Sequence, residues 1–177
     1  EQEMELQFLD EVNALFPYEL ILQCVSDYEV RLEKPENPAY IGIDFGRYRD
    51  STVITVVEKL EDNTLKIIFI DELLRKDFNE QIKHIERLIN FYGPAGVAID
   101  KTGMGIPLHD LLVKKFPHVD GVTLTANTKE AIIKALHSAM NNRKIVIPAD
   151  ATQLINQLRT FQRVQTRTTV KYEAPQG

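Results

Sequence analysis

Three apolar runs rich in β-branched residues occupy residues 40–74, and only short segments separate them. The runs are YIGIDFG at 40–46, STVITVVEKL at 51–60 and TLKIIFIDELL at 64–74. Parallel neighbours need a connection of about a dozen residues or more, whereas antiparallel neighbours need only a turn. This part of the chain therefore predicts an antiparallel three-stranded meander.

From residue 78 onward, helical and strand patterns alternate. Apolar residues recur at helical spacing over 78–92, Gly93 and Pro94 end that helix, and GVAID at 96–100 is a compact apolar strand. The further expected elements are helices at 106–116, 128–141 and 152–164, and strands at 121–125, 144–148 and 166–173. Three antiparallel strands followed by strand–helix alternation describe an α/β mixed sheet flanked by helices, the order of the ribonuclease H-like fold.

The N-terminal segment has a different character. Residues 3–15 and 18–26 place apolar side chains at helical spacing, and the stretch EKPENPA at 33–39 has the composition of a linker. We therefore expect a helical linker or hinge segment at 1–38 and a ribonuclease H-like domain at 39–177.

Composition narrows the class of protein. The chain has 177 residues and one cysteine, Cys24, which excludes an internal disulfide framework and a zinc site built from cysteines. Neither a membrane-spanning apolar run nor a signal-peptide pattern is present, so an intracellular setting is expected.

Charge is segregated along the chain although the net charge is only −5. Residues 1–38 carry a net charge of −8, and residues 127–177 carry +5. The basic C-terminal residues, among them Arg143, Lys144 and Arg163, could form a surface that faces phosphates, or they could be a solvated face with no ligand.

Asp44 and Asp100 each stand at the end of an otherwise apolar strand. A carboxylate there calls for a cation or strong donors, although Asp44 could also cap the turn through Gly46. If the first and fourth strands are neighbours, the two carboxylates face each other, and a divalent cation between them offsets their repulsion. All-oxygen ligands select Mg²⁺ or Mn²⁺, and two such ions about 3.5–4 Å apart can hydrolyse a phosphodiester. The pair therefore indicates a metal-dependent nuclease.

The segments after each aspartate supply basic and loop-forming residues. Arg47, Arg49 and Lys101 are candidate phosphate contacts. Asp50 is expected to fix its turn rather than to bind metal. The residues expected to shape the two loops are Gly46, Asp50, Thr52, Thr102, Gly103 and Gly105. The four histidines show no metal-ligand spacing and are expected to be structural or surface residues.

The segments IGIDFGRYRDSTVITVVE and VAIDKTGMG resemble the C-terminal nuclease domain of the large terminase subunit of tailed viruses. That family pairs a strand ending in Asp-x-Gly/Ala-x-x-x-Asp-x-Thr with a later strand ending in Asp/Glu-x-Thr/Asn-Gly-x-Gly. The segment ELQFLDEVNALFPYELILQC also resembles the stretch that joins the family's ATPase and nuclease domains.

This resemblance implies a two-metal DNA endonuclease that cuts concatemeric viral DNA in the host-cell cytoplasm, with Asp44 and Asp100 as ligands of Mg²⁺ or Mn²⁺. It also implies double-stranded DNA, an N-terminal ATPase domain of the same parent chain, the small terminase subunit and the portal as partners, and no membrane. The family usually has a third acidic ligand in a late helix. The late carboxylates Asp150 and Glu173 lack that helical setting, so we expect the third ligand beyond Gly177. We therefore expect this piece alone to cleave DNA weakly or not at all.

Two other functions fit part of the pattern. IGIDFG followed by Ser51 and Thr52 also resembles the first phosphate loop of actin-like and sugar-kinase-like ATPases, although that fold needs two lobes. A non-catalytic module that binds DNA or docks onto the packaging motor is the third possibility. Nucleotide binding and metal-dependent nicking would distinguish the three.

Overall fold

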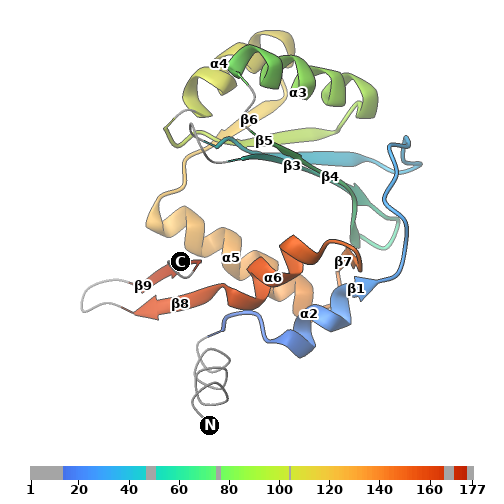
Figure 1. The fold of residues 1–177 in the computed structure, drawn as a ribbon, viewed down its shortest axis with the longest axis vertical. Coiled ribbons are helices and arrows are strands. Elements are labelled where there is room, and N and C mark those ends of the chain that lie inside the picture. The colour runs from blue at the N-terminus through green and yellow to red at the C-terminus, as the bar shows by residue number, and fades with distance from the viewer. Residues whose placement is uncertain (1–13, 47–50, 75–76, 104, 166–169, 175–177) are drawn as a thin grey trace. The chain divides into compact units, whose positions relative to one another are not determined.

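The computed structural model describes residues 14–46, 51–74, 77–103, 105–165 and 170–174, with the backbone alone at 163–165 and 170–171. The chain divides into two compact units (Figure 1). One unit holds residues 29–124, and the other combines residues 1–28 with 125–177. The predicted division into 1–38 and 39–177 stays a prediction.

The unit of residues 29–124 opens with the predicted antiparallel meander. Its strands are β2 (Ala39–Asp44), β3 (Thr52–Lys59) and β4 (Leu65–Leu73). The middle strand β3 pairs antiparallel with both of the others. The turn between β3 and β4 contains Asn63 with a φ of 67°, a conformation that asparagine tolerates better than most residues.

The same unit then alternates between helices and strands. Its further elements are α3 (Phe78–Tyr92), β5 (Gly96–Asp100), α4 (Gly105–Lys115) and β6 (Val119–Val122). The Asp77 side chain caps α3 by accepting a hydrogen bond from the Glu80 amide, and Gly93 ends the helix with a φ of 52°. Because β5 pairs parallel with β2, the strand order within this unit is β4-β3-β2-β5-β6, and the sheet is mixed. The predicted α/β mixed sheet is confirmed.

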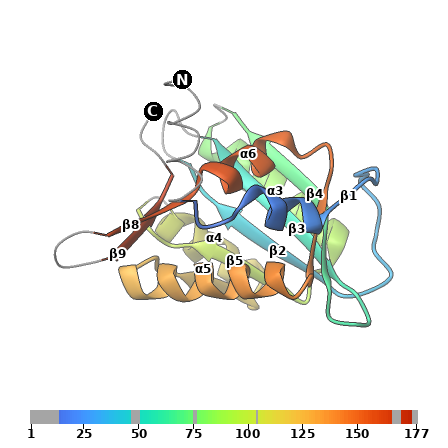
Figure 2. The same cartoon turned by 90° about the horizontal axis from the view of Figure 1, so that it is seen from below.

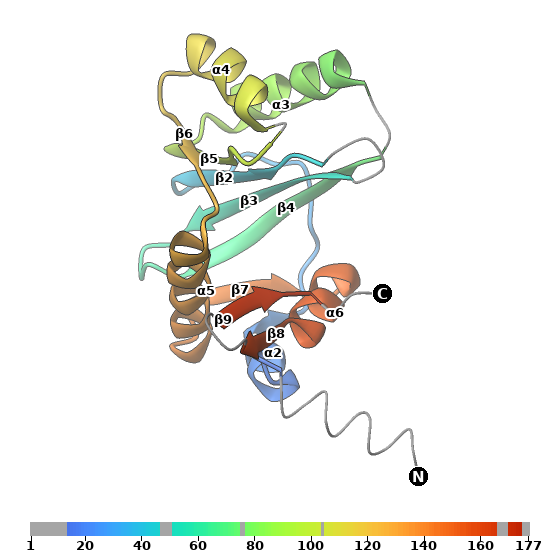
Figure 3. The same cartoon turned by 90° about the vertical axis from the view of Figure 1, so that its left-hand side faces the viewer.

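Helices α3 and α4 cover one face of this sheet (Figure 3). Alternate residues of the strands point into that core, including Ile41, Ile43, Ile54 and Ile99. Residues between them, such as Gly42, lie on the opposite face and are exposed. The period of two thus assigns the side chains of β2, β5, residues 52–56 of β3 and residues 69–73 of β4 to one face or the other. A register shift between Val56 and Val57 interrupts the alternation beyond them.

The second unit gathers elements from both ends of the chain. These are α2 (Tyr18–Cys24), β1 (Val25–Ser26), α5 (Ala126–Asn141), β7 (Ile145–Pro148), α6 (Thr152–Thr160), β8 (Gln162–Gln165) and β9 (Val170–Glu173). Helix α2 packs against α5 and α6, and β1 pairs parallel with β7. Strands β8 and β9 form an antiparallel pair (Figure 2). Within the described ranges, no helix has the length and apolar character needed to cross a bilayer.

Three predicted boundaries are wrong. The strand expected at 121–125 is β6 at 119–122, because its partner β5 ends at Asp100, and Thr125 already caps α5. The helix expected at 152–164 ends at Thr160, and the backbone turns extended at Phe161 to enter β8. The helix expected at 18–26 ends at Cys24, because Val25 and Ser26 form β1 and pair with β7. The last strand is described at 170–173, and its expected residues 166–169 lie outside the described ranges. The helix predicted at 3–15 falls mostly outside the described residues.

Adjacent leucines of α4 provide a matched test of the core. Leu112 is fully buried, whereas Leu111 is 43% exposed. Substitution Leu112→Ala should lower the free energy of unfolding by about 2–5 kcal/mol, because it leaves a cavity in the core. Leu111→Ala should cost less than about 1 kcal/mol. Equilibrium unfolding in urea measures both values, and equal losses would contradict the assignment of faces on α4.

The single cysteine gives a chemical test of the second unit. Cys24 is buried, and its thiol donates a hydrogen bond to the Met140 carbonyl at 3.5 Å. Burial raises the pKa of the Cys24 thiol, and the positive charge of Arg143 opposes that shift in part. Because thiolate is the reactive form, Cys24 should resist a disulfide reagent at pH 8 in the native protein and react fully once urea unfolds it. Rapid labelling of the native protein would contradict this packing.

Candidate metal centre

The two aspartates lie at the same end of neighbouring parallel strands. The register of β2 and β5 aligns Ile43 with Ile99, so Asp44 and Asp100 are the next residue on each strand. Parallel neighbours are about 4.8 Å apart. The first and fourth strands of the predicted order are therefore adjacent, as the interpretation of Asp44 and Asp100 requires.

Both aspartates also belong to the sheet face opposite α3 and α4. The buried residues of β2 are Ile41 and Ile43, and those of β5 are Val97 and Ile99. Alternation places Asp44 and Asp100 on the other face, where Asp44 is exposed and Asp100 is half-buried. Two carboxylates thus share one face and one edge, and solvent reaches them.

Hydrogen bonding orients the Asp100 carboxylate. Its Oδ1 atom accepts a hydrogen bond from the Thr102 amide at 2.9 Å. Gly103 follows with a φ of 65°, and α4 begins two residues later at Gly105. A donor on one carboxylate oxygen leaves the rest of the group's acceptor capacity for another ligand.

The loop after Asp44 is held at its two ends. Thr52 is buried, and its hydroxyl accepts a hydrogen bond from the Gly46 amide at 3.2 Å. The same hydroxyl donates to Oε1 of Gln81 on α3. These contacts fit the expected loop-shaping roles of Gly46 and Thr52, while Asp50 lies outside the described residues.

The structure describes only some of the predicted basic contacts. Arg47 and Arg49 lie outside the described residues, and so does the side chain of Arg163. Arg143 and Lys144 are exposed at the turn between α5 and β7, in the other unit from the aspartates. All of these DNA contacts stay predictions.

Lys101 lies on the α4 side of the sheet rather than beside the Asp100 carboxylate. A Cβ atom added to Gly121 of β6 would stand 1.8 Å from Cδ of Lys101 and 3.0 Å from Cδ2 of His109 on α4. The methylene stem of Lys101 therefore runs across Gly121 beneath α4.

Three of the four histidines lie close to a neighbouring polar side chain, and His118 is exposed at the turn before β6. His84 on α3 pairs with Asp71, which is aligned with the buried Ile54 and so lies on the helix-covered face. His137 contacts Asn141 at 3.0 Å on α5. Nδ1 of His109 is buried 3.6 Å from Oδ1 of Asp110 and has no hydrogen-bond partner among the residues that the structure describes. No set of three metal-binding side chains comes together in the described part of the chain.

Sequence reasoning missed one further carboxylate on this face. Val53 is aligned with Asp44 on one side and with Glu72 of β4 on the other, so Glu72 stands in the same row, two strands from Asp44. The available signal was the Asp71–Glu72 pair within a strand, since adjacent residues point to opposite faces.

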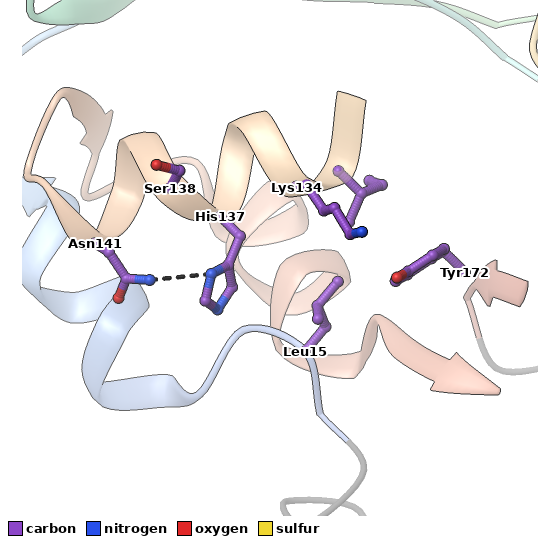
Figure 4. Close-up of a pocket in the computed structure, with 7 residues that line it drawn as sticks. Leu15, Lys134, His137, Ser138, Asn141 and Tyr172 are labelled. Atoms are coloured by element: carbon purple, nitrogen blue, oxygen red, sulfur yellow. Dashed lines mark hydrogen bonds between the residues drawn. The ribbon is translucent and has the colours of Figure 1, made fainter. Parts of the chain in front are cut away.

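A small pocket lies within the unit that contains α5. It has a volume of about 330 Å³ and is lined by Leu15, Ile133, Lys134, His137, Ser138, Asn141 and Tyr172 (Figure 4). None of these lining residues is a carboxylate, so the pocket lacks the ligands that a hard cation prefers.

Comparison with known proteins identifies the family. The model of the terminase RNaseH-like domain matches residues 41–173. A large terminase subunit of Thermus virus P23-45 is 25% identical over 93% of this chain and 35% of its own length. The chain thus spans about a third of that relative.

Solved structures share the fold. The large terminase nuclease of thermophilic phage G20c, with bound magnesium, aligns with a TM-score of 0.78 at 22% identity, over 93% of this chain and 89% of that one. The nuclease domain of the large terminase subunit of bacterial virus Sf6, with manganese and beta-thujaplicinol, aligns with a TM-score of 0.62 at 12% identity, over 90% and 87% of the two chains. With a family model covering most of its length, this chain belongs to the terminase RNaseH-like domain family.

Proposed function

We propose that this chain is the nuclease domain of a large terminase subunit and cleaves DNA with the help of divalent cations. The observation that carries the proposal is the placement of Asp44 and Asp100 on adjacent parallel strands, at one edge and on the face that α3 and α4 leave uncovered. Membership of the terminase family supports the same activity and favours it over an actin-like ATPase.

The residues present fit a hard cation. Two carboxylates offer oxygen ligands from one side, and the Thr102 amide already orients one of them. We assign Asp44 and Asp100 as metal ligands and Mg²⁺ or Mn²⁺ as the ions, two in number. Two aspartates fill only part of two coordination shells, so water, DNA phosphate and a further carboxylate complete them.

In this proposal the metal supplies Lewis-acid activation of water and stabilisation of the leaving oxygen of a phosphodiester. The two aspartates hold the ions at the sheet edge. Arg47, Arg49, Lys101, Arg143, Lys144 and Arg163 bind DNA phosphates without reading bases.

The setting of the activity follows from the family. We propose that the parent chain also carries an ATPase domain, and that the small terminase subunit and the portal are its partners during packaging of concatemeric viral DNA inside the host cell. The length of the curated relative is compatible with such an additional domain, because this chain covers 35% of it.

The first test concerns the metal ligands. Asp44→Asn and Asp100→Asn should each weaken Mn²⁺ binding at least about tenfold, because each removes a charged ligand, and should abolish Mn²⁺-dependent nicking of supercoiled plasmid by the full large subunit. Asp120→Asn is the matched control, since Asp120 is an exposed carboxylate on β6 that is aligned with Ala98 on the same sheet face. It should leave both measurements unchanged. DNA binding without metal-dependent nicking by the full subunit would support the non-catalytic module instead.

The second test concerns the basic surface. Each phosphate contact contributes about 0.9 to the slope of log K against log salt concentration. The double substitution Arg143→Ala and Lys144→Ala should therefore lower that slope by about 2. Lys114 and Lys115 form the control pair, because they are adjacent exposed lysines in the last turn of α4 for which no DNA contact is proposed. Their replacement by alanine should not change the slope. An unchanged slope in the first variant would exclude Arg143 and Lys144 as DNA contacts.

A further inference from the structure

Two glycines pack against the residues that follow Asp100. At Gly105 an added Cβ atom would stand 1.8 Å from the Asp100 carbonyl oxygen and 2.9 Å from the carbonyl carbon. At Gly121 it would stand 1.8 Å from Cδ and 2.5 Å from Cγ of Lys101. The missing side chain of Gly105 leaves room for the Asp100 carbonyl, and that of Gly121 leaves room for the methylene groups of Lys101. Any other residue type would place a Cβ atom in that space.

Moving the Asp100 carbonyl to make room for a methyl group at position 105 would be energetically costly. It belongs to the same peptide as the Lys101 amide, which donates to the Val122 carbonyl at 2.8 Å and so ties the end of β5 to β6. Rotation of this peptide would break that hydrogen bond and turn the backbone of Asp100. Its carboxylate would then lose the alignment with the Thr102 amide.

The methylene groups of the Lys101 side chain also restrain the peptide that joins Asp100 to Lys101. It lies across Gly121, with the imidazole of His109 close by on α4. A methylene chain that is packed between a strand and a helix has few rotamers left, so it restrains its own backbone. This restraint concerns the stem and is separate from any contact that the ammonium group makes with phosphate.

We propose that Gly105 and Gly121 are positioning residues that fix the Asp100 carboxylate for metal binding, Gly105 by admitting the Asp100 carbonyl and Gly121 by admitting the stem of Lys101. This inference rests on the proposed function, because it assigns Asp100 as a metal ligand. In this role neither glycine supplies a ligand atom.

Manganese affinity, followed by the electron paramagnetic resonance signal of free Mn²⁺, tests the proposal in the folded protein. Gly105→Ala should bind Mn²⁺ about 10–100-fold more weakly, the range found when groups that orient metal ligands are lost. Gly42→Ala is the matched control, because an added Cβ at Gly42 has no neighbour within 4 Å and the residue lies on β2 near Asp44. It should bind Mn²⁺ like the wild type. DNA binding in EDTA should be equal in all of these variants.

A double-mutant cycle tests Gly121 through Lys101. Gly121→Ala should weaken Mn²⁺ binding in the wild-type background and have no effect in the Lys101→Ala background, because the glycine is needed only while the stem crosses it. This cycle also tests the positioning role if the Gly105→Ala variant does not fold, which a non-cooperative unfolding curve would reveal. A methyl group that merely loosened the fold would lower the melting temperature in both backgrounds alike.

The outcomes separate this inference from the proposed function. If Asp100→Asn binds Mn²⁺ as well as the wild type, the proposed metal site is wrong. If Asp100→Asn loses Mn²⁺ binding while folded Gly105→Ala keeps wild-type affinity, or if Gly121→Ala costs the same affinity in both backgrounds, the metal site stands and the positioning role of the glycines is wrong.

Discussion

The parallel pairing of β2 with β5 is the contact on which the candidate site depends. More than fifty residues separate Asp44 from Asp100 in the chain, and the register of Ile43 with Ile99 places them side by side. A shift of one residue in either strand would send one carboxylate to the core face, among buried apolar side chains such as Ile41 and Ile99, where its desolvation would be costly. The position of the two carboxylates relative to each other therefore depends on the register between β2 and β5.

The apolar face of the sheet sets the register. Ile41 and Ile43 of β2, Ile54 of β3, and Val97 and Ile99 of β5 all point toward α3 and α4. Burial of these side chains supplies the stabilisation, and the same alternation leaves the opposite face for polar chemistry. Stability and function are thus divided between the two faces of one sheet.

The end of β5 combines a strand, a tight loop and the start of α4 within six residues. The Val122 carbonyl and the absence of a side chain at Gly105 act on the peptide that joins Asp100 to Lys101. The Thr102 amide donates to the Asp100 carboxylate itself. By contrast, the loop after Asp44 is tied through the Thr52 hydroxyl to Gly46 and to Gln81 of α3. Contacts within its own segment orient the Asp100 carboxylate, whereas after Asp44 these hydrogen bonds hold Gly46 and Thr52, the residues on either side of the loop.

The sequence alone determined the order of strands and helices from β2 to α6, the α/β class and the two aspartates, because these depend on local periodicity and on charges that interrupt apolar strands. It placed α3 and β5 at their observed bounds, since Asp77, Gly93 and Pro94 mark the ends of α3. Tertiary structure decided what depends on partners distant in the chain. Strand β6 ends where β5 stops offering hydrogen bonds, and residues 162–165 are a strand because β9 pairs with them. It also decided that Lys101 crosses Gly121 on the α4 side and that Glu72 shares a row with Asp44, because a side chain's surroundings follow from register and packing between strands, which no local pattern encodes.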